Sequence, residues 1–300
     1  MFEDANEKSR NLTEPSSELR ARVLAMFRES KKDAVLPKIL FAEGDVVEKE
    51  ETKSKRMRAL LVRVGIDQTK RTGFWNGPVN SQTNEFAYVA ISEPLKIRRG
   101  MEKPFSQLSD TLSVFGATLP KQLASKQMHL DPDFEFLSYG DVRERAKQLM
   151  KLSPGDLVVF YSGLRGFRRK KPHGRRLVYA IIGLFVIERI VLAKSLPAAD
   201  RHRNAHTRRT GGFSLGEIVI FGNPNGSGRL ERCQPIGSYR KRAYRVTPEL
   251  IRKWGGLSVK DGYLQRSARL PEIKDAEAFY RWFRRLKIPF IQRNNPEATA

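Results

Sequence analysis

The segment from Arg58 to Ile66 limits the fold more than any other feature, because it carries few polar side chains along its length. Strands of that kind are buried on both faces, so we expect this one near the centre of a sheet. Comparable patterns predict four further strands. They are Phe86–Ile91, Asp156–Ser162, Leu177–Leu192 and Glu217–Phe221. The first is expected to be the neighbour of Arg58–Ile66 in the sheet. The third is either one long strand or two strands with a bend at Gly183.

Three helices have recognisable start and stop signals. The clearest runs from Ala276 to Leu286 with Asp275 as its N-cap, and its apolar spacing is typical of a stripe facing the core rather than of a base-stacking platform. The other two are Asp141–Leu152, stopped by Pro154-Gly155, and Thr247–Trp254, capped by Thr247. Strands and helices mix without strict βαβ alternation. This predicts an α/β fold, or α+β, with a mixed β-sheet core flanked by helices.

Residues 1–55 are expected to form an accessory N-terminal extension, partly disordered, with a short helix at Ser17–Ser30. Residues 56–300 would then form a single α/β domain. The polar N-terminus does not resemble a secretory signal, and the longest apolar run, Val178–Val186, is too short to span a bilayer as a helix. The sequence therefore predicts a cytoplasmic protein.

The charge balance points to a polyanionic partner. The chain has 56 Lys and Arg against 33 Asp and Glu, a formal net charge of +23. Such a charge favours nucleic acid, and we expect DNA, in double-stranded form and with modified bases. Membrane binding would need a basic amphipathic helix or a lipidation signal, and neither is clear in the sequence. The oligomeric state is not predicted.

A polar loop follows the first predicted strand. Asp67 stands at the carboxyl end of that strand, where active sites of open α/β sheets collect. Asparagines after it suit reading of a base edge, and aromatic rings suit stacking on an extruded base. An ordinary turn at Asn76-Gly77-Pro78, with Asp67 as a cap, is the alternative. The predicted base-binding residues are Phe74, Trp75 and Asn80, with Tyr161 from a later strand.

Two basic segments are candidates for phosphate contact. The first is a loop between two strong strands, and the second is Asp200–Arg209. In the second, His202 and His206 stand four residues apart, which suits acid–base chemistry or phosphate contact better than a metal, because no HExxH pattern is present. The predicted phosphate-binding residues are Arg165, Arg168, Arg169, Lys170, Lys171, Arg175, Arg176, Arg208 and Arg209.

The sequence lacks the motifs of several enzyme classes. The chain has no GxxxxGK[ST] loop, and its single cysteine, Cys233, excludes both a disulfide framework and the PCxxC zinc site of nucleobase deaminases. His129-Leu130-Asp131 matches the HxD start of a non-haem iron triad, but the match is very short. The sequence therefore predicts no metal and no cofactor.

Several segments resemble the third group of the nucleotide modification associated domain family. They are LLVRVGIDQT with WNGPV, EFAYVAISE, SPGDLVVFYSGLRG, YAIIGLFVIE, the RNAH segment, GEIVIFGNPNGSG and YLQRSARLPEI. The resemblance covers residues 57–275 and rests on ordered patches rather than one catalytic signature. It implies a domain tied to modified bases in DNA, encoded by phages or by hosts facing them. GDLVVFYSGL and YAIIGLFVIE are also loosely similar to strand pairs of PUA-like domains that bind modified bases.

Together these features predict a DNA glycosylase that flips out and excises a modified base, for example from phage DNA in antiviral defence. Asp67 would stabilise the oxocarbenium-like transition state or position water, and Asn76 or Asn80 would read the base. His206 would protonate the leaving base or donate a hydrogen bond to it. Two alternatives stay open. One is a non-catalytic reader of modified bases, and the other is a base-modifying transferase with a donor site at the Gly222–Gly228 turn.

Overall fold

The computed structural model describes residues 56–67, 75–264 and 269–296. The predicted N-terminal extension and Phe74 lie outside these ranges, so the division at residue 55 stays a prediction. Within the described ranges, no helix is long and apolar enough to cross a membrane.

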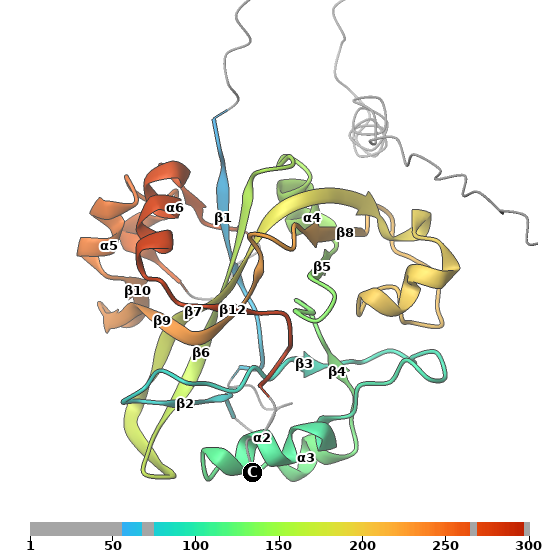
Figure 1. The fold of residues 1–300 in the computed structure, drawn as a ribbon, viewed down its shortest axis with the longest axis horizontal. Helices are drawn as coiled ribbons and strands as arrows, with labels where there is room; N and C mark the ends of the chain where they lie inside the picture. The colour runs from blue at the N-terminus through green and yellow to red at the C-terminus, as the bar shows by residue number, and fades with distance from the viewer. Residues whose placement is uncertain (1–55, 68–74, 265–268, 297–300) are drawn as a thin grey trace, which may run out of the picture. The chain divides into compact units, whose positions relative to one another are not determined.

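A mixed sheet forms the core of the described residues (Figure 1). Its main path has the order β10-β9-β7-β6-β1-β11. The strands on this path are β1 (Ala59–Arg63), β6 (Leu157–Arg168), β7 (Lys171–Leu192), β9 (Gly228–Arg240), β10 (Ala243–Val246) and β11 (Glu272–Ile273). Strand β1 pairs in parallel with β6 and antiparallel with β11. Its apolar residues are buried and it has a strand on each side, so the predicted burial is confirmed, although β1 is the second strand from one end of the main path rather than near its centre.

Shorter strands extend this sheet. They are β2 (Pro78–Asn80), which pairs with β6, β5 (Ser138–Asp141), which pairs with β8 (Ile218–Gly222), and β12 (Phe290–Ile291), which pairs with β9. Strands β3 (Ile91–Ser92) and β4 (Met128–His129) form a separate antiparallel pair. With helices around the sheet, the predicted mixed α/β class is confirmed.

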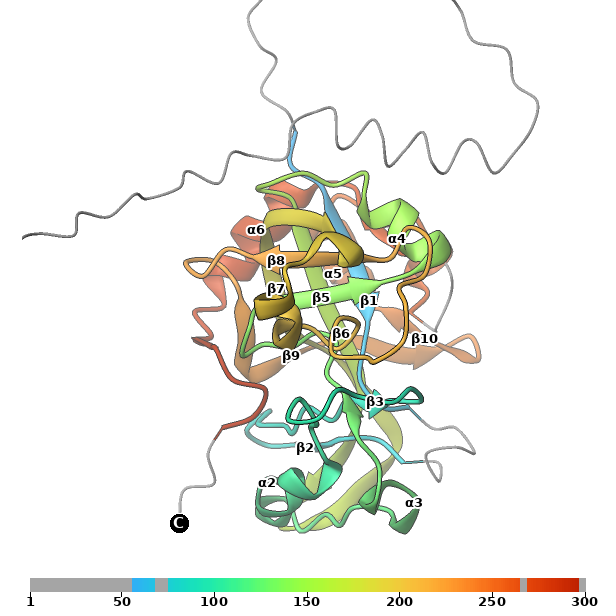
Figure 2. The same cartoon turned by 90° about the vertical axis from the view of Figure 1, so that its right-hand side faces the viewer.

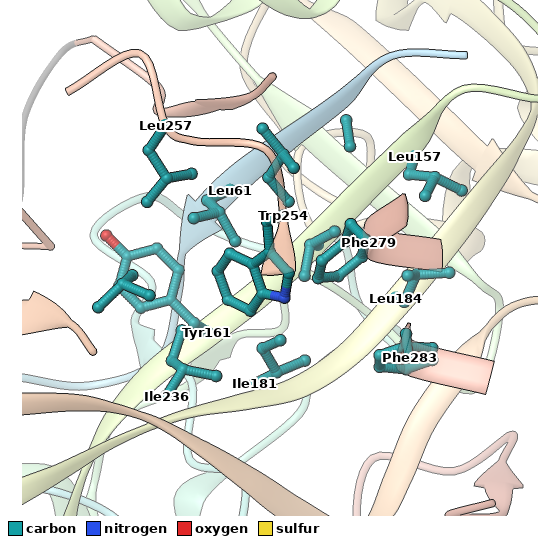
Figure 3. Packing of buried hydrophobic residues seen from close by; sticks show 14 of the residues in the cluster. Leu61, Leu157, Tyr161, Ile181, Leu184, Ile236, Trp254, Leu257, Phe279 and Phe283 are labelled. Carbon is teal, nitrogen blue, oxygen red and sulfur yellow. The ribbon is translucent and has the colours of Figure 1, made fainter. Parts of the chain in front are cut away.

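Alternate residues of β6 face two different cores, as the period of a strand requires. Leu157, Val159 and Tyr161 belong to the core that α5 (Pro248–Lys253) and α6 (Ala276–Arg285) cover. Figure 3 shows Leu157 and Tyr161 in this core with Phe279 and Phe283 of α6. The predicted stripe on α6 is confirmed, because its Phe279 and Phe283 are buried in this core. The predicted N-cap is also confirmed, since Asp275 accepts a hydrogen bond of 2.9 Å from the backbone N–H of Ala278.

The opposite face of the sheet carries an aromatic cluster. Phe160 of β6 meets Phe134, Phe185 and Tyr139 with ring centroids 4.7 to 5.8 Å apart. Edge-to-face and tilted contacts of this kind are favourable for aromatic rings. They anchor β5 and the segment before it on this face.

The remaining helices are short. They are η2 (Phe105–Leu108), α2 (Ser109–Val114), α3 (Lys121–Ala124), α4 (Arg143–Leu149), η3 (Ala193–Ser195), η4 (Ala198–Arg203) and η5 (Lys260–Gly262). Figures 1 and 2 place α2 and α3 at the end of the domain opposite α6. Helix α4 lies within the predicted Asp141–Leu152, and α5 within the predicted Thr247–Trp254.

The prediction of a strand at Phe86–Ile91 next to β1 is wrong. Phe86 makes one isolated bridge, to Val79, and regular pairing begins only at Ile91, with β4 rather than β1. The carbonyl of Val89 accepts one hydrogen bond of 2.8 Å from the N–H of Ile66, just beyond β1, and at Tyr88 a side chain takes the place of a strand partner. The amide of Asn295 bonds both the N–H and the C=O of Tyr88, at 2.8 Å each.

The basic segment predicted as a loop is a β-hairpin. Strands β6 and β7 continue until Arg168 pairs with Lys171, leaving only Arg169 and Lys170 in the turn. Both turn residues have positive φ, 48° and 58°, as a two-residue type I′ turn requires. The sequence hides this turn, because Asn-Gly or Asp-Gly usually occupies it. Strand β7 confirms the option of one long strand.

Candidate functional site

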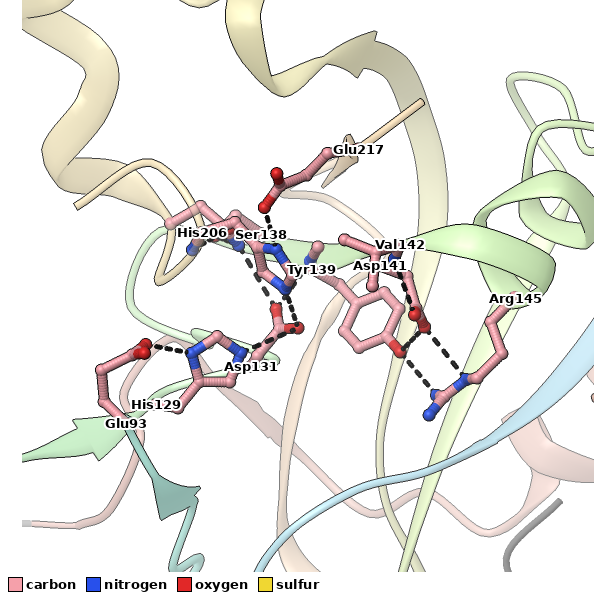
Figure 4. Close-up of polar contacts among 12 residues, drawn as sticks. Glu93, His129, Asp131, Ser138, Tyr139, Asp141, Val142, Arg145, His206 and Glu217 are labelled. Atoms are coloured by element: carbon pink, nitrogen blue, oxygen red, sulfur yellow. Dashed lines mark hydrogen bonds and ion pairs between the residues drawn. The ribbon is translucent and has the colours of Figure 1, made fainter. Parts of the chain in front are cut away.

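Two histidines and one aspartate meet beside β5. His129 ends β4, Asp131 follows it, and His206 comes from the segment after η4. Both Nε2 atoms face the same carboxylate oxygen, Oδ2 of Asp131, at 3.8 Å from His129 and 3.4 Å from His206 (Figure 4). We call these three residues the triad. Each of the three side chains is 7% exposed, so the triad is buried but not sealed from solvent.

Each imidazole is held from behind by a glutamate. Nδ1 of His129 lies 2.6 Å from Oε2 of Glu93, and Nδ1 of His206 lies 2.5 Å from Oε1 of Glu217. Arg209 bridges the two glutamates, with Nε 3.2 Å from Glu93 and Nη1 3.6 Å from Glu217. These contacts fix the orientation of both rings.

The other oxygen of Asp131 is occupied. Oδ1 accepts a hydrogen bond of 2.6 Å from the backbone N–H of Gly140 and one of 3.3 Å from the side chain of Asn204. A Cβ at position 140 would collide with the ring of His206, so glycine is what lets β5 approach the triad. Asp131 is therefore locked with Oδ2 directed toward the histidines.

The environment shifts several pKa values. Burial lowers the pKa of His206, but hydrogen bonds to Asp131 and Glu217 outweigh it and raise the pKa to about 9. Burial raises the pKa of Glu93, yet the hydrogen bond from His129 brings it below the ordinary value. Glu217 follows the same pattern, with its pKa lowered by His206. Both glutamates are thus carboxylates at neutral pH.

A second polar group adjoins the triad (Figure 4). The hydroxyl of Tyr139 donates to Oδ2 of Asp141 at 2.5 Å, and Nε of Arg145 lies 3.0 Å from the same oxygen. Burial raises the pKa of Tyr139, and negative charge on Asp131 contributes to the rise. Tyr139 therefore stays neutral, as a hydrogen-bond donor, at physiological pH.

The triad contains the atoms that a cation needs. One possible ligand atom from each of the three residues lies within 4.8 Å of the others. Imidazole nitrogen and carboxylate oxygen are ordinary metal ligands in proteins. The same arrangement without a cation can relay protons between a carboxylate and water.

The residues predicted as catalytic have different partners, although the amide of Asn76 lies beside Asp67, 3.4 Å from the carbonyl of Ile66. His206 belongs to the triad, whereas Asp67 lies just beyond β1, with Oδ2 3.9 Å from Nη2 of Arg63. Asn76 is buried and its amide donates to the carbonyl of Gly163 at 2.8 Å, next to the end of β1. The partner of His206 is Asp131 rather than Asp67.

The described base-binding candidates are also engaged with the protein. Tyr161 is buried and its hydroxyl donates to the carbonyl of Leu264 at 2.7 Å. Oδ1 of Asn80 accepts a hydrogen bond of 2.9 Å from the backbone N–H of Gln82, which makes Asn80 a turn residue. Trp75 is half-buried.

The predicted phosphate-binding residues divide into two groups. On the β6–β7 hairpin, Arg168, Arg169, Lys170, Lys171 and Arg176 are exposed, and Arg165 is half-buried. The side chain of Arg175 is outside the described residues. Arg208 is buried, where it pairs with Asp133, and Arg209 holds the two glutamates of the site. Phosphate contact by Arg208 would require it to leave Asp133.

The sequence offered His129 and Asp131 only as a short HxD match to an iron triad, too weak to predict a metal, and it assigned no role to Glu93 or Glu217. The available signals were the HxD match at His129 and the isolated His206, but nothing local connects them. His202, expected on the same helix face as His206, is exposed at the end of η4, while His206 is buried beyond it.

Comparison with known families agrees with the resemblance noted from the sequence. A family model described as nucleotide modification associated domain 3 matches residues 58–276, from the start of β1 to the start of α6. All three residues of the triad and both glutamates lie inside the matched range. No curated protein and no solved structure matches the chain.

Proposed function

Because the chain belongs to the nucleotide modification associated domain 3 family, which links it to modified nucleotides, we propose that it is an enzyme acting on a modified base in DNA. The proposed reaction is that of a DNA glycosylase, hydrolysis of the bond between base and deoxyribose. The observation that carries the proposal is Oδ2 of Asp131, a carboxylate oxygen held in place by Gly140 and Asn204 and facing two fixed imidazoles.

In this reaction Asp131 has two roles. Its negative charge stabilises the positive charge that develops on the sugar as the C1′–N bond breaks, and its Oδ2 accepts a proton from the attacking water. The water oxygen bonds to C1′, and the proton passes to the leaving nitrogen of the base. We assign water activation to this site rather than base protonation by His206, because that imidazole is fixed between the carboxylates of Asp131 and Glu217.

The β6–β7 hairpin would hold the DNA backbone. Its exposed arginines and lysines follow one another on a rigid two-stranded support, and no acidic residue lies between Arg165 and Arg176. Such a surface attracts phosphates without reading sequence. The tip reaches the loop after α2, where Gly116 packs against the backbone of Lys170.

The test is incubation of the full-length protein with naturally hypermodified phage DNAs and with unmodified DNA, followed by mass spectrometry of free bases and assay of abasic sites. We expect a free modified base and an alkali-labile site. Asp131→Asn should reduce release at least 100-fold, in line with loss of a general base. Asp110→Asn, an exposed carboxylate on α2, is the control.

Asp67 remains the competing carboxylate. If Asp67→Asn abolishes base release and Asp131→Asn does not, the chemistry belongs at the end of β1. If neither the wild type nor any variant releases a base from any of the DNAs, the glycosylase proposal fails. Nucleosides of increased mass would instead indicate a base-modifying transferase.

A second candidate function, a non-catalytic reader, is favoured by a different surface. The guanidinium of Arg245 lies over the ring of Tyr263, 5.5 Å from the ring centroid. Both residues line a cavity of about 630 Å³. Aromatic and guanidinium planes are what a single base stacks on. A reader would bind modified DNA more tightly than unmodified DNA and leave it chemically unchanged.

A further inference from the structure

We propose that His129, Asp131 and His206 bind one divalent transition-metal ion through two imidazole nitrogens and one carboxylate oxygen. The inference concerns the same site as the proposed function and deepens it by naming a cofactor. It replaces the sequence-based expectation of no metal. It does not need the glycosylase reaction, because the binding of an ion is measured by itself.

The spacing of the ligand atoms suits an ion. Oδ2 of Asp131 lies 3.8 Å from Nε2 of His129 and 3.4 Å from Nε2 of His206. The first distance is too long for a hydrogen bond. Bonds of about 2.0–2.2 Å from one ion to nitrogen and oxygen place neighbouring ligand atoms roughly 3–4 Å apart.

The support behind the ligands is the second argument. Histidines that bind metals almost always donate the other ring N–H to a carboxylate or carbonyl, which leaves the ligating nitrogen unprotonated. Both histidines of the triad have this arrangement, His129 with Glu93 and His206 with Glu217. The two glutamates come from distant parts of the chain, and Arg209 joins them.

Charge is the third argument. Asp131, Glu93 and Glu217 are acidic, and Arg209 is the one guanidinium paired with this group among the described residues. Three carboxylates against one guanidinium leave an excess of acidic groups in a buried site. Uncompensated buried charge is costly, and a divalent cation, which displaces any proton from the nitrogens that bind it, offsets this excess.

The ligand set selects the class of ion. Two imidazoles favour zinc and iron over magnesium and calcium, which prefer oxygen ligands. Two histidines and one carboxylate leave coordination positions open for water, as in catalytic zinc sites and non-haem Fe(II) sites. With an ion bound, Oδ2 of Asp131 would be one of its ligands, and the ion would supply the water activation of the proposed hydrolysis by lowering the pKa of a water in an open position.

The experiment measures metal content of the full chain. The protein is stripped with a chelator, dialysed, and loaded with Zn²⁺, with Fe²⁺ under nitrogen, or with Mg²⁺, then desalted and analysed by inductively coupled plasma mass spectrometry. We expect about one Zn²⁺ or Fe²⁺ per chain and no retained Mg²⁺. His129→Ala and His206→Ala should each lose at least nine tenths of the ion, and exposed His202→Ala should keep it.

Circular dichroism shows whether each variant is folded, and absorption spectra of the Co²⁺-loaded protein report on the ligands of the ion. If an alanine variant does not fold, His206→Gln replaces it, and the d–d absorption of the Co²⁺ form shows whether the ion has lost a ligand. The inference is overturned if the wild type retains neither Zn²⁺ nor Fe²⁺, or if the folded triad variants retain as much as the wild type.

Metal binding and base release can fail separately. An ion bound by the triad in a protein that releases no base leaves this inference standing and removes the glycosylase. If the protein binds no ion and still releases the base at the same rate in the presence of a chelator, the glycosylase proposal stands and the metal site is ruled out.

Discussion

Glu217 holds His206 by its Nδ1 atom, at 2.5 Å, while Nε2 of the same ring faces Asp131. Glu93 and His129 repeat this relationship on the other side of Asp131. Two copies of one arrangement, built from unrelated segments, position two ring nitrogens around one oxygen.

Glu217→Gln should weaken metal binding 10- to 100-fold, because a neutral amide makes the imidazole a poorer ligand than a carboxylate does. Chelator competition with Zn²⁺ measures the change in affinity. Glu249→Gln, an exposed glutamate on α5, is the matched control and should bind as the wild type does. Equal affinities for the two variants would show that Glu217 does not support a metal ligand.

Gly140→Ala should both destabilise the protein and lower its metal content. The new methyl group would overlap the ring of His206, and overpacking of this kind costs about 1–3 kcal/mol. Urea unfolding measures the loss of stability, and metal analysis measures occupancy. Gly211→Ala is the control, since a Cβ there meets no atom within 4 Å. A Gly140→Ala protein as stable and as metal-loaded as the control would contradict the crowding argument.

Local patterns predicted the core well. The i, i+3, i+4 spacing of Phe279, Trp282 and Phe283 predicted α6, and the apolar run after Arg58 predicted β1, because burial leaves a period in the sequence. Both predictions concern residues close together in the chain. The missed feature at Tyr88 depends instead on Asn295, 207 positions away, which no local pattern reveals.

The site could not be predicted for the same physical reason. His206 lies 75 positions after Asp131 in the sequence, and the two meet beside β5, where Gly140 and Asn204 hold Asp131. Glu93 and Glu217 also carry no motif in the sequence. Asp67 attracted a prediction because its local setting, the end of a strand, is visible without the fold, and its catalytic role stays a prediction.

Phe279→Ala should lower the free energy of unfolding by about 3–5 kcal/mol, because it removes a fully buried ring from the core between α6 and the sheet. Chemical denaturation measures the loss. Leu215→Ala, with a side chain 62% exposed, should change stability by less than about 0.5 kcal/mol. Similar values for both variants would mean that α6 does not pack as described.

The β6–β7 hairpin should dominate the salt dependence of DNA binding. Arg168→Ala with Lys171→Ala should reduce the slope of log Kobs against log salt by about 2, since each phosphate contact contributes roughly 0.9. Binding titrations at several salt concentrations measure the slope. The control is Arg284→Ala with Arg285→Ala, which removes two exposed charges from α6. An equal reduction in the control would mean that net charge, rather than the hairpin, governs binding.

Cys233 should report unfolding as a single buried thiol. Burial raises its pKa to about 12, although nearby Arg229 opposes the rise. At pH 8 only about one thiol in 10⁴ would then be a thiolate, against roughly a quarter for a free cysteine of pKa 8.5. We expect no reaction with a thiol reagent in the folded protein and one equivalent per chain in denaturant.

Raising the pH should accelerate the reaction while the fold persists, because the folded thiol titrates only near pH 12. Rapid modification of the folded protein at pH 8 would mean that β9 opens or that Cys233 is accessible. The loss of reactivity on refolding then measures how completely β9 has closed around Cys233, independently of any ligand of the triad.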